Sequence, residues 1–225
     1  MKITAVSDLH GYFPRLIGGD LLIVAGDLTA CDTDIQHYQF CEWLDAAPYR
    51  KKIVIAGNHD NNIQRNMIDK LDRCLYLEDE GCEFEGLKIW GTPWILWFHG
   101  INPHCKAFTG TEAHLKKKFD LIPHDTDILI CHGPPFGILD KIYEWGDKDK
   151  PKLTGSKELL AKIMEVKPKL VIFGHIHEHG NRRGHFADFS ENYYIDFNNV
   201  SIVNERYEAV NKPTEIRFDN DFRII

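Results

Sequence analysis

The chain has 225 residues, of which 43% are hydrophobic and 27% are charged, a composition that is typical of globular proteins and excludes a disordered or collagen-like chain. The 27 Lys and Arg against 34 Asp and Glu give a net charge of −7 with His neutral, which disfavours binding to long nucleic acids or to a membrane surface. The count of 12 His beside 3 Met directs attention to a metal or acid–base site, because His is the commonest metal ligand.

The amino-terminal segment and the cysteines indicate a cytoplasmic protein. The first apolar stretch is interrupted at Ser7 and Asp8, so it is too short for a signal peptide or a transmembrane span. The six Cys contain no CxxC pair, and we interpret them as buried or incidental thiols. Because one α/β core routinely reaches this length, we expect a single domain over residues 1–225.

Short β-branched runs in the first part of the chain predict buried strands. The connection from His10 to Asp20 is short and contains Gly and Pro, so we expect a loop there instead of a crossover helix. The expected strands cover residues 3–6, 21–25 and 53–56, and the expected helices cover residues 32–46 and 63–71.

The second part of the chain continues the alternation of strands and helices. We expect strands at 83–84, 87–91, 127–131 and 170–173, helices at 111–119 and 156–166, and edge strands at 195–197, 201–203 and 215–218. Residues 92–100 form a long aromatic segment of a kind that is usually functional or a lid. Trp94 and Trp97 in this segment are candidates for substrate contacts, with packing against the sheet as the alternative.

Five apolar runs end abruptly in Asp, Asn or His. The carboxyl ends of the strands in an open α/β sheet face one crevice, so we expect these side chains to converge although they are far apart in sequence. The cluster consists of Asp8, His10, Asp27, Asn58, His132, His175 and His177. His59 and Asp60 follow Asn58 directly in the sequence and adjoin this cluster.

This donor set is suited to two divalent cations. Two cations about 3.5–4 Å apart need a bridging carboxylate and several further ligands each, with positions left open for water and substrate. A mixture of carboxylate, amide and imidazole favours Mn, Fe, Zn or Co over Mg or Ca, which prefer oxygen ligands. The spacings Asp8-x-His10 and His175-x-His177 also place each pair on one side of an extended chain.

The ordered motifs resemble those of the calcineurin-like metallophosphoesterase superfamily. They are D-x-H at Asp8–His10, G-D at Gly26–Asp27, G-N-H-D at Gly57–Asp60, H-G-P-P at His132–Pro135 and G-H-x-H at Gly174–His177. The small single-domain branch, typified by the animal metallophosphoesterase-domain proteins, is similar over nearly the whole chain. The resemblance implies an α/β fold in which a β-sandwich of two mixed sheets is flanked by helices, with the site at the carboxyl ends of the strands.

The resemblance also implies a role for each residue of the cluster. One metal would be held by Asp8, His10 and His177, the other by Asn58, His132 and His175, with Asp27 bridging, His59 catalytic and Asp60 its orienting partner.

The implied activity is hydrolysis of small phosphodiesters, such as cyclic nucleotides, by a metal-bridging hydroxide. Protein phosphatases of the superfamily carry an Arg shortly after the bridging Asp, whereas this chain has Leu28 to Cys31 there, which argues against phosphoprotein substrates. The alternatives are a phosphomonoesterase or nucleotide phosphatase, and a metal-binding scaffold for protein interactions. The expected partner is a small phosphoester, with neither long nucleic acid nor membrane.

Overall fold

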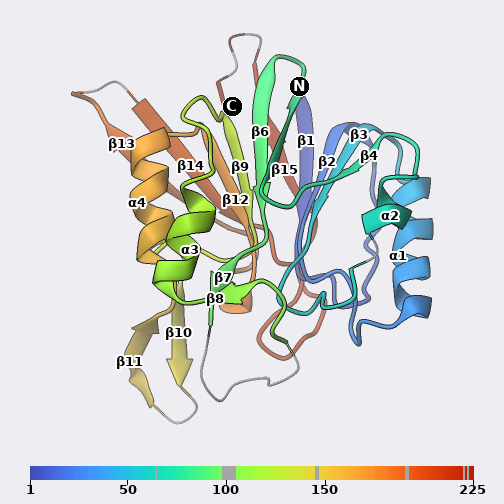
Figure 1. The fold of residues 1–225 in the computed structure, drawn as a ribbon, viewed down its shortest axis with the longest axis horizontal. Coiled ribbons are helices and arrows are strands. Elements are labelled where there is room, and N and C mark those ends of the chain that lie inside the picture. Colours follow the sequence, from blue (N-terminus) through green and yellow to red (C-terminus); the bar gives the residue numbers. More distant parts are fainter. Residues whose placement is uncertain (64, 98–104, 145–146, 191–192, 220, 222) are drawn as a thin grey trace.

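Two β-sheets pack face to face in the computed structural model, with helices on their outer faces (Figure 1). The structure describes residues 1–63, 65–97, 105–144, 147–190, 193–219, 221 and 223–225. This arrangement confirms the predicted fold class of two mixed sheets flanked by helices. None of the helices within these ranges is long and apolar enough to cross a membrane.

The first sheet has the strand order β15-β1-β2-β3-β4. Strands β1 to β4 are parallel, and β15 runs antiparallel to β1. Their side chains are buried along most of β1, β2 and β3, because one face packs on the other sheet and the other face is covered by helices. The strands are β1 (Lys2–Val6), β2 (Gly19–Ala25), β3 (Tyr49–Ile55), β4 (Cys74–Tyr76) and β15 (Thr214–Arg217).

The second sheet has the strand order β13-β14-β12-β9-β6-β5. Its four central strands are parallel, and the two edge strands run antiparallel to their neighbours. The parallel strands of both sheets end at the lower end of the sandwich in Figure 1. The polar residues that follow these strands therefore lie at the same end of the molecule. The strands are β5 (Glu80–Phe84), β6 (Leu87–Thr92), β9 (Ile128–Cys131), β12 (Leu170–Phe173), β13 (Arg182–Asp188) and β14 (Tyr193–Asn199).

In the described part of the chain, four helices cover the outer faces of the sheets. In Figure 1, α1 (Asp34–Ala46) and α2 (Arg65–Ile68) lie on the first sheet, and α3 (Glu112–Phe119) and α4 (Lys157–Val166) lie on the second. The first residues of three helices are fixed by capping hydroxyls, which accept hydrogen bonds from otherwise unpaired amides. These caps are Thr33 for α1, Thr111 for α3 and Ser156 for α4.

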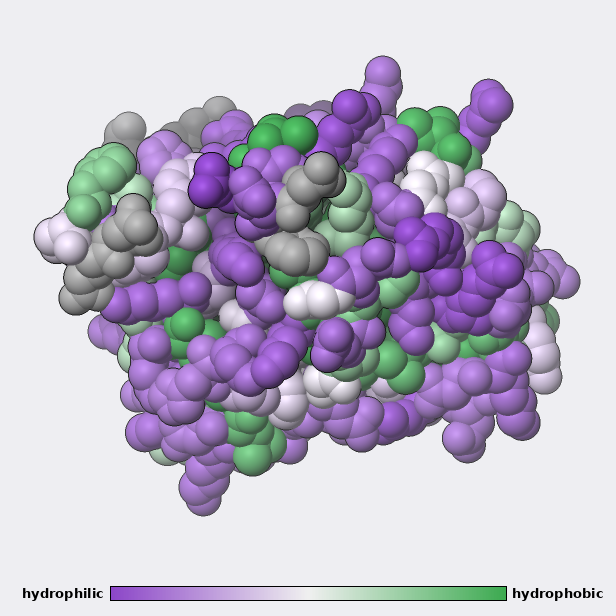
Figure 2. Space-filling model, turned by 90° about the horizontal axis from the view of Figure 1, so that it is seen from above, coloured by the Kyte–Doolittle hydropathy of each residue, from purple (hydrophilic) through white to green (hydrophobic). Residues whose placement is uncertain are grey.

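The core lies mainly between the two sheets. Alternate side chains of the strands meet there, and the helices seal two further clusters on the outer faces. The buried residues between the sheets include Ile3, Ile23, Ile55, Ile89, Ile130 and Ile172. The end of the molecule that carries the amino ends of the parallel strands is mostly hydrophilic, with small separate apolar patches (Figure 2).

Two short pairs of strands lie near the carboxyl ends of the sheets. Strand β7 (Ile95–Leu96) pairs with β8 (Thr109–Gly110), and a hairpin of β10 (Lys141–Glu144) and β11 (Asp147–Leu153) projects from the lower end in Figure 1. A short 3-10 helix, η1 (His177–His179), follows β12. As expected, the described chain between His10 and Asp20 contains no helix.

Several predicted boundaries differ from the structure. The predicted helix 63–71 is helical only at α2 within the described residues, because Asp69 accepts a hydrogen bond from Tyr76 N (2.9 Å) and the chain turns into β4. Residues 201–203 form isolated bridges instead of a strand, since Ser201 N donates to Asn199 Oδ1 (3.1 Å). The predicted loop 92–100 contains β7, and its residues 98–100 lie outside the described residues.

Candidate metal centre

The polar residues singled out from the sequence gather where the parallel strands of both sheets end. Asp8, Asp27 and Asn58 lie just beyond β1, β2 and β3, and His132 and His175 lie just beyond β9 and β12. The two sheets are joined at this point, because a ring nitrogen of His132 lies 2.8 Å from the carbonyl oxygen at the end of β2. The expected convergence of five strand ends is therefore present in the fold.

The backbone bends sharply as it leaves these strands. Asp8 and Asp27 each have a φ of 53°, and His175 has a φ of 65°. Such left-handed conformations of residues other than Gly cost about 1–3 kcal/mol and persist where surrounding contacts enforce them. Here Asp8 N donates to Gly26 O (2.9 Å), and His175 N donates to Asp8 Oδ2 (3.0 Å). These bends direct the side chains toward the gap between the sheets.

Two buried carboxylates form the centre of the cluster. The exposed fraction is 0% for Asp8 and 1% for Asp27. His177 Nε2 lies 3.1 Å from Asp8 Oδ1, and His132 Nε2 lies 3.3 Å from Asp27 Oδ1. His10 Nε2 lies 3.7 Å from Asp27 Oδ2. Buried carboxylates need nearby positive charge, which His132, His177 and any bound cation can supply.

Two motif glycines allow the chain to approach the carboxylates closely. A Cβ atom added at Gly174 would overlap Asp8 Oδ2 and Ser7 Oγ, and one at Gly57 would overlap Asp27 Oδ1. A side chain at either position would displace a carboxylate from the cluster. The glycines of the G-N-H-D and G-H-x-H motifs are therefore required by close packing.

The donor atoms lie close enough to share cations. The side chains form three groups whose ligand atoms all lie within 4.8 Å of one another, namely Asp8, His10 and His177; His10, Asp27 and His59; and Asp8, Asp27 and His132. Asn58 Oδ1 lies 3.1 Å from His132 Nε2, which extends the cluster. His10 Nε2 is buried and has no hydrogen-bond partner among the described residues. A buried imidazole nitrogen of this kind fits a metal ligand.

The protonation states of the histidines differ in the metal-free site. Burial lowers the pKa of His10 to about 4, and burial together with the neighbouring His132 lowers the pKa of His175 to about 3. Both imidazoles are therefore neutral at pH 7, the form that binds metals. Burial opposes a charge on His132 as well, but contact with Asp27 outweighs it and raises the pKa of His132 to about 9. The Asp8 carboxylate likewise raises the pKa of His177 against the effect of burial.

The contacts of Asp60 are with backbone amides, and its orienting role toward His59 stays a prediction. Asp60 is fully buried, and its two oxygens accept hydrogen bonds from Gly57 N (2.7 Å), Asp27 N (2.9 Å) and Leu28 N (3.0 Å). It therefore fixes the loops after β2 and β3 to each other, and its oxygens are already engaged by backbone amides.

The His59 ring is contacted by other groups. Its Nδ1 lies 3.3 Å from Cys105 Sγ, a residue that no motif in the sequence indicates, and its Nε2 lies 3.9 Å from Asp27 Oδ2. The ring lines the pocket beside the cluster. Cys105 is thus a hydrogen-bonding partner of the His59 ring among the described residues.

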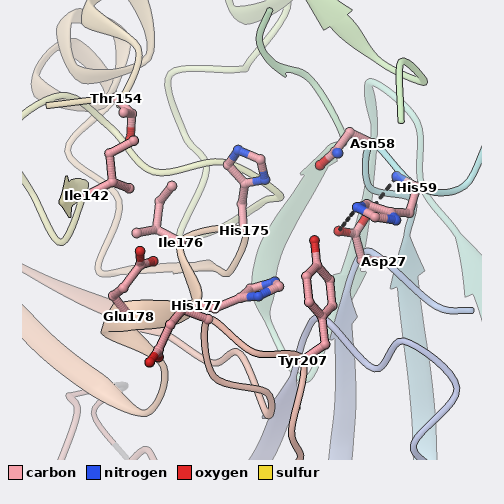
Figure 3. Close-up of a pocket in the computed structure, with 11 residues that line it drawn as sticks. Asp27, Asn58, His59, Ile142, Thr154, His175, Ile176, His177, Glu178 and Tyr207 are labelled. Carbon is pink, nitrogen blue, oxygen red and sulfur yellow. Dashed lines mark hydrogen bonds and ion pairs between the residues drawn. The ribbon is translucent and has the colours of Figure 1, made fainter. Parts of the chain in front are cut away.

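The pocket beside the cluster contains an aromatic side chain that the sequence analysis does not predict. Figure 3 shows Tyr207 directed into the pocket, which is also lined by Asp27, Asn58, His59, Ile142, Thr154, His175, Ile176, His177, Glu178 and Glu205. Tyr207 lies in the carboxyl-terminal part of the chain, outside all five motifs. Its place at the site follows from the fold and has no recognisable signal in the sequence.

The two tryptophans proposed from the sequence are not among the residues that line this pocket. Trp94 Nε1 donates to Asp79 Oδ2 (2.9 Å), and Lys118 Nζ lies 4.4 Å from the centre of the Trp94 ring. These contacts and an edge contact with Phe108 hold Trp94 against α3, and Trp94 lines a second pocket that His175 also lines. Its contact with substrate stays a prediction. Trp97 has an exposed fraction of 46%.

Comparison with known proteins places this arrangement in a family. The model of the calcineurin-like phosphoesterase family matches residues 1–179. Metallophosphoesterase domain-containing protein 1 of Homo sapiens and that of Mus musculus are each 34% identical to this chain over 96% of its length and 70% of theirs. The crystal structure of TT1561 of Thermus thermophilus has a TM-score of 0.57 at 15% identity, covering 88% of this chain and 89% of that one.

The chain belongs to the calcineurin-like phosphoesterase family. Membership supports a phosphoester hydrolase, and the clusters of Asp and His ligand atoms indicate a dinuclear metal site. The structural likeness to TT1561 extends the agreement to the fold.

The tight contact at Gly174 leads to a prediction. Gly174→Ala should weaken binding of Mn²⁺ at least about tenfold, because the new methyl group displaces the Asp8 carboxylate and an altered metal ligand shell typically costs 10–100-fold in affinity. Isothermal titration calorimetry measures the affinity. Gly184→Ala in β13 is the matched control, since its Cβ would lie 3.6 Å from the nearest atom. Wild-type affinity in Gly174→Ala would contradict the close-packing argument.

Proposed function

We propose that this chain hydrolyses small phosphodiesters, such as cyclic nucleotides, using two divalent cations at the strand ends. The observation that carries the proposal is the charge of the pocket. The described residues that line it include Glu178 and Glu205 but no Lys or Arg. A phosphomonoester carries about two negative charges near neutral pH, whereas a phosphodiester carries one. An acidic wall without Lys or Arg among its described residues therefore favours the diester.

Each cation would be held by three side chains of its own and by a shared carboxylate. We assign one cation to Asp8, His10 and His177, the other to Asn58, His132 and His175, and the shared position to Asp27. The first set is one of the groups with ligand atoms within 4.8 Å, and His132 contacts both Asn58 and Asp27. The mixed donors favour Mn²⁺, with Fe, Zn and Co as alternatives. Bound cations of this kind offset charge on phosphoryl oxygens and activate water.

His59 is proposed to contact the reacting phosphoryl group. A Cys105 thiol that donates to Nδ1 leaves the His59 Nε2–H directed toward Asp27 and the pocket. From there it can donate a hydrogen bond to a phosphoryl oxygen; a protonated ring, with Cys105 Sγ accepting from Nδ1, can instead donate a proton from Nε2 to the leaving oxygen, a role generally worth about 10²–10⁴-fold in rate. Asp60 supports this position indirectly, through the loop that carries His59.

The alternative functions have weaker support. A phosphomonoesterase or nucleotide phosphatase would need to accommodate a second negative charge beside Glu178 and Glu205. A scaffold that binds proteins needs no intact ligand set, whereas all seven proposed metal ligands are present. We also propose a cytoplasmic location for this activity, which the six free cysteines support.

The proposed activity is tested with matched substrates. We expect the protein loaded with Mn²⁺ to hydrolyse bis(p-nitrophenyl) phosphate with a kcat/KM at least about tenfold above that for p-nitrophenyl phosphate. The acidic wall repels the second negative charge of the monoester, and a barrier higher by about 1.4 kcal/mol corresponds to a tenfold lower rate. Protein treated with EDTA should be inactive. Assays with Co²⁺, Zn²⁺ and Mg²⁺ rank the metals. Faster hydrolysis of the monoester, or no hydrolysis of either compound, would overturn the proposal.

Variants of the acidic wall identify the source of the preference. Glu178→Gln combined with Glu205→Gln should raise kcat/KM for the monoester relative to the diester. Glu42→Gln, which alters an exposed carboxylate on α1, is the control and should leave the ratio unchanged.

The raised histidine pKa values predict how metal binding depends on pH. His132, with a pKa of about 9, holds a proton at pH 7 in the metal-free protein, and the raised pKa of His177 favours its protonated form; each ring must lose such a proton to bind a cation. Metal affinity should therefore rise between pH 7 and pH 9, by about tenfold per pH unit for each proton displaced.

Calorimetry in buffers of different ionisation enthalpy counts these protons at pH 7. The exposed histidine variant His124→Asn should release the same number as the wild type. Metal binding without proton release would contradict the assignment of His132 and His177 as ligands.

A further inference from the structure

A short turn beyond β14 presents Tyr207 to the pocket in a fixed conformation. Asn204 Oδ1 accepts hydrogen bonds from Arg206 N (2.9 Å) and Glu208 N (3.0 Å), and Val203 pairs with Ala209 across the turn. Tyr207 itself has a φ of 60°, a left-handed conformation that is unfavourable for a bulky residue. Strain of this kind is found where surrounding contacts enforce it, often at functional sites.

The Tyr207 ring is packed against the histidines of the metal centre. Its centroid lies 4.8 Å from that of His10 and 5.0 Å from that of His177, with nearly perpendicular ring planes. The His59 ring lies 6.3 Å away. Edge-to-face contacts at these separations are favourable, so the ring occupies a defined place between two proposed ligands and the proposed catalytic histidine.

The hydroxyl group extends from this ring into the pocket. Figure 3 shows it directed toward the space between His175 on one side and Asn58 and Asp27 on the other. A phosphoryl group bound by cations at the strand ends would occupy this space. The residue has an exposed fraction of 40%, so a substrate that enters the pocket can reach the hydroxyl.

The acidic lining of the pocket favours an uncharged hydrogen-bond donor for the substrate. The lining includes acidic residues, and among the described residues no Lys or Arg is present to orient the phosphoryl oxygens there. A phenol donates a hydrogen bond without adding charge at neutral pH. Such a donor suits an anion with a single negative charge, whose remaining charge would be offset by the cations.

We propose that the Tyr207 hydroxyl donates a hydrogen bond to a non-bridging phosphoryl oxygen of the substrate, which makes Tyr207 a substrate-binding residue. This inference rests on the proposed function and adds a residue from beyond the region that the family model matches, residues 1–179. The competing explanation is structural, with the ring merely supporting His10 and His177.

Tyr207→Phe separates the two explanations, because it keeps the ring and removes the hydroxyl. For Mn²⁺-loaded protein we expect kcat/KM for bis(p-nitrophenyl) phosphate to fall about tenfold to hundredfold, the range for loss of one hydrogen bond to a charged group. The affinity for inorganic phosphate, measured by calorimetry, should fall at least about tenfold. Bound manganese, measured by elemental analysis, should stay at the wild-type level.

The control is Tyr194→Phe, which removes the hydroxyl of a half-exposed tyrosine on β14 and should match the wild type in all three measurements. Wild-type phosphate affinity in Tyr207→Phe, or a loss of manganese that accounts for the lower activity, would overturn the inference. If the wild type hydrolyses no phosphoester, the proposed function fails, and the phosphate titration still decides whether the Tyr207 hydroxyl binds the anion.

Discussion

The burial of two carboxylates side by side is the constraint on which the rest of this site depends. Asp8 and Asp27 are almost completely inaccessible to solvent, and uncompensated charges in such a place are strongly unfavourable. The first sheet supplies both carboxylates, while the second sheet supplies His132 and His177 against them. The two sheets must therefore pack in one relative position for the charges to be matched, which links the fold to the chemistry.

The parts around the carboxylates keep this geometry in place. Gly57 and Gly174 allow the chain to come close, and Asp60 joins the loops after β2 and β3 through three backbone amides. Beyond them lies a pocket whose wall is acidic and aromatic. The positive charge that attracts a phosphoester would thus come from the bound cations. A chain with a net charge of −7 could then bind an anion at this site.

The sequence predicts the strand-end cluster well because each buried strand is an unbroken apolar run that stops at Asp, Asn or His, as at Asp27 and His132. It misses β13, which is mostly exposed and carries charged residues instead of an apolar alternation. Contacts between segments that are far apart in the chain also cannot be predicted from the sequence. The anchoring of Trp94 by Asp79 and the contact of His59 with Cys105 arise only when the chain folds.

The central claim is that the buried carboxylates hold two divalent cations, and anomalous X-ray diffraction from crystals grown with Mn²⁺ tests it most directly. The account predicts two anomalous peaks about 3.5–4 Å apart, with Asp27 between them, one beside Asp8 and the other beside Asn58. A single peak, or manganese bound away from these carboxylates, would contradict it.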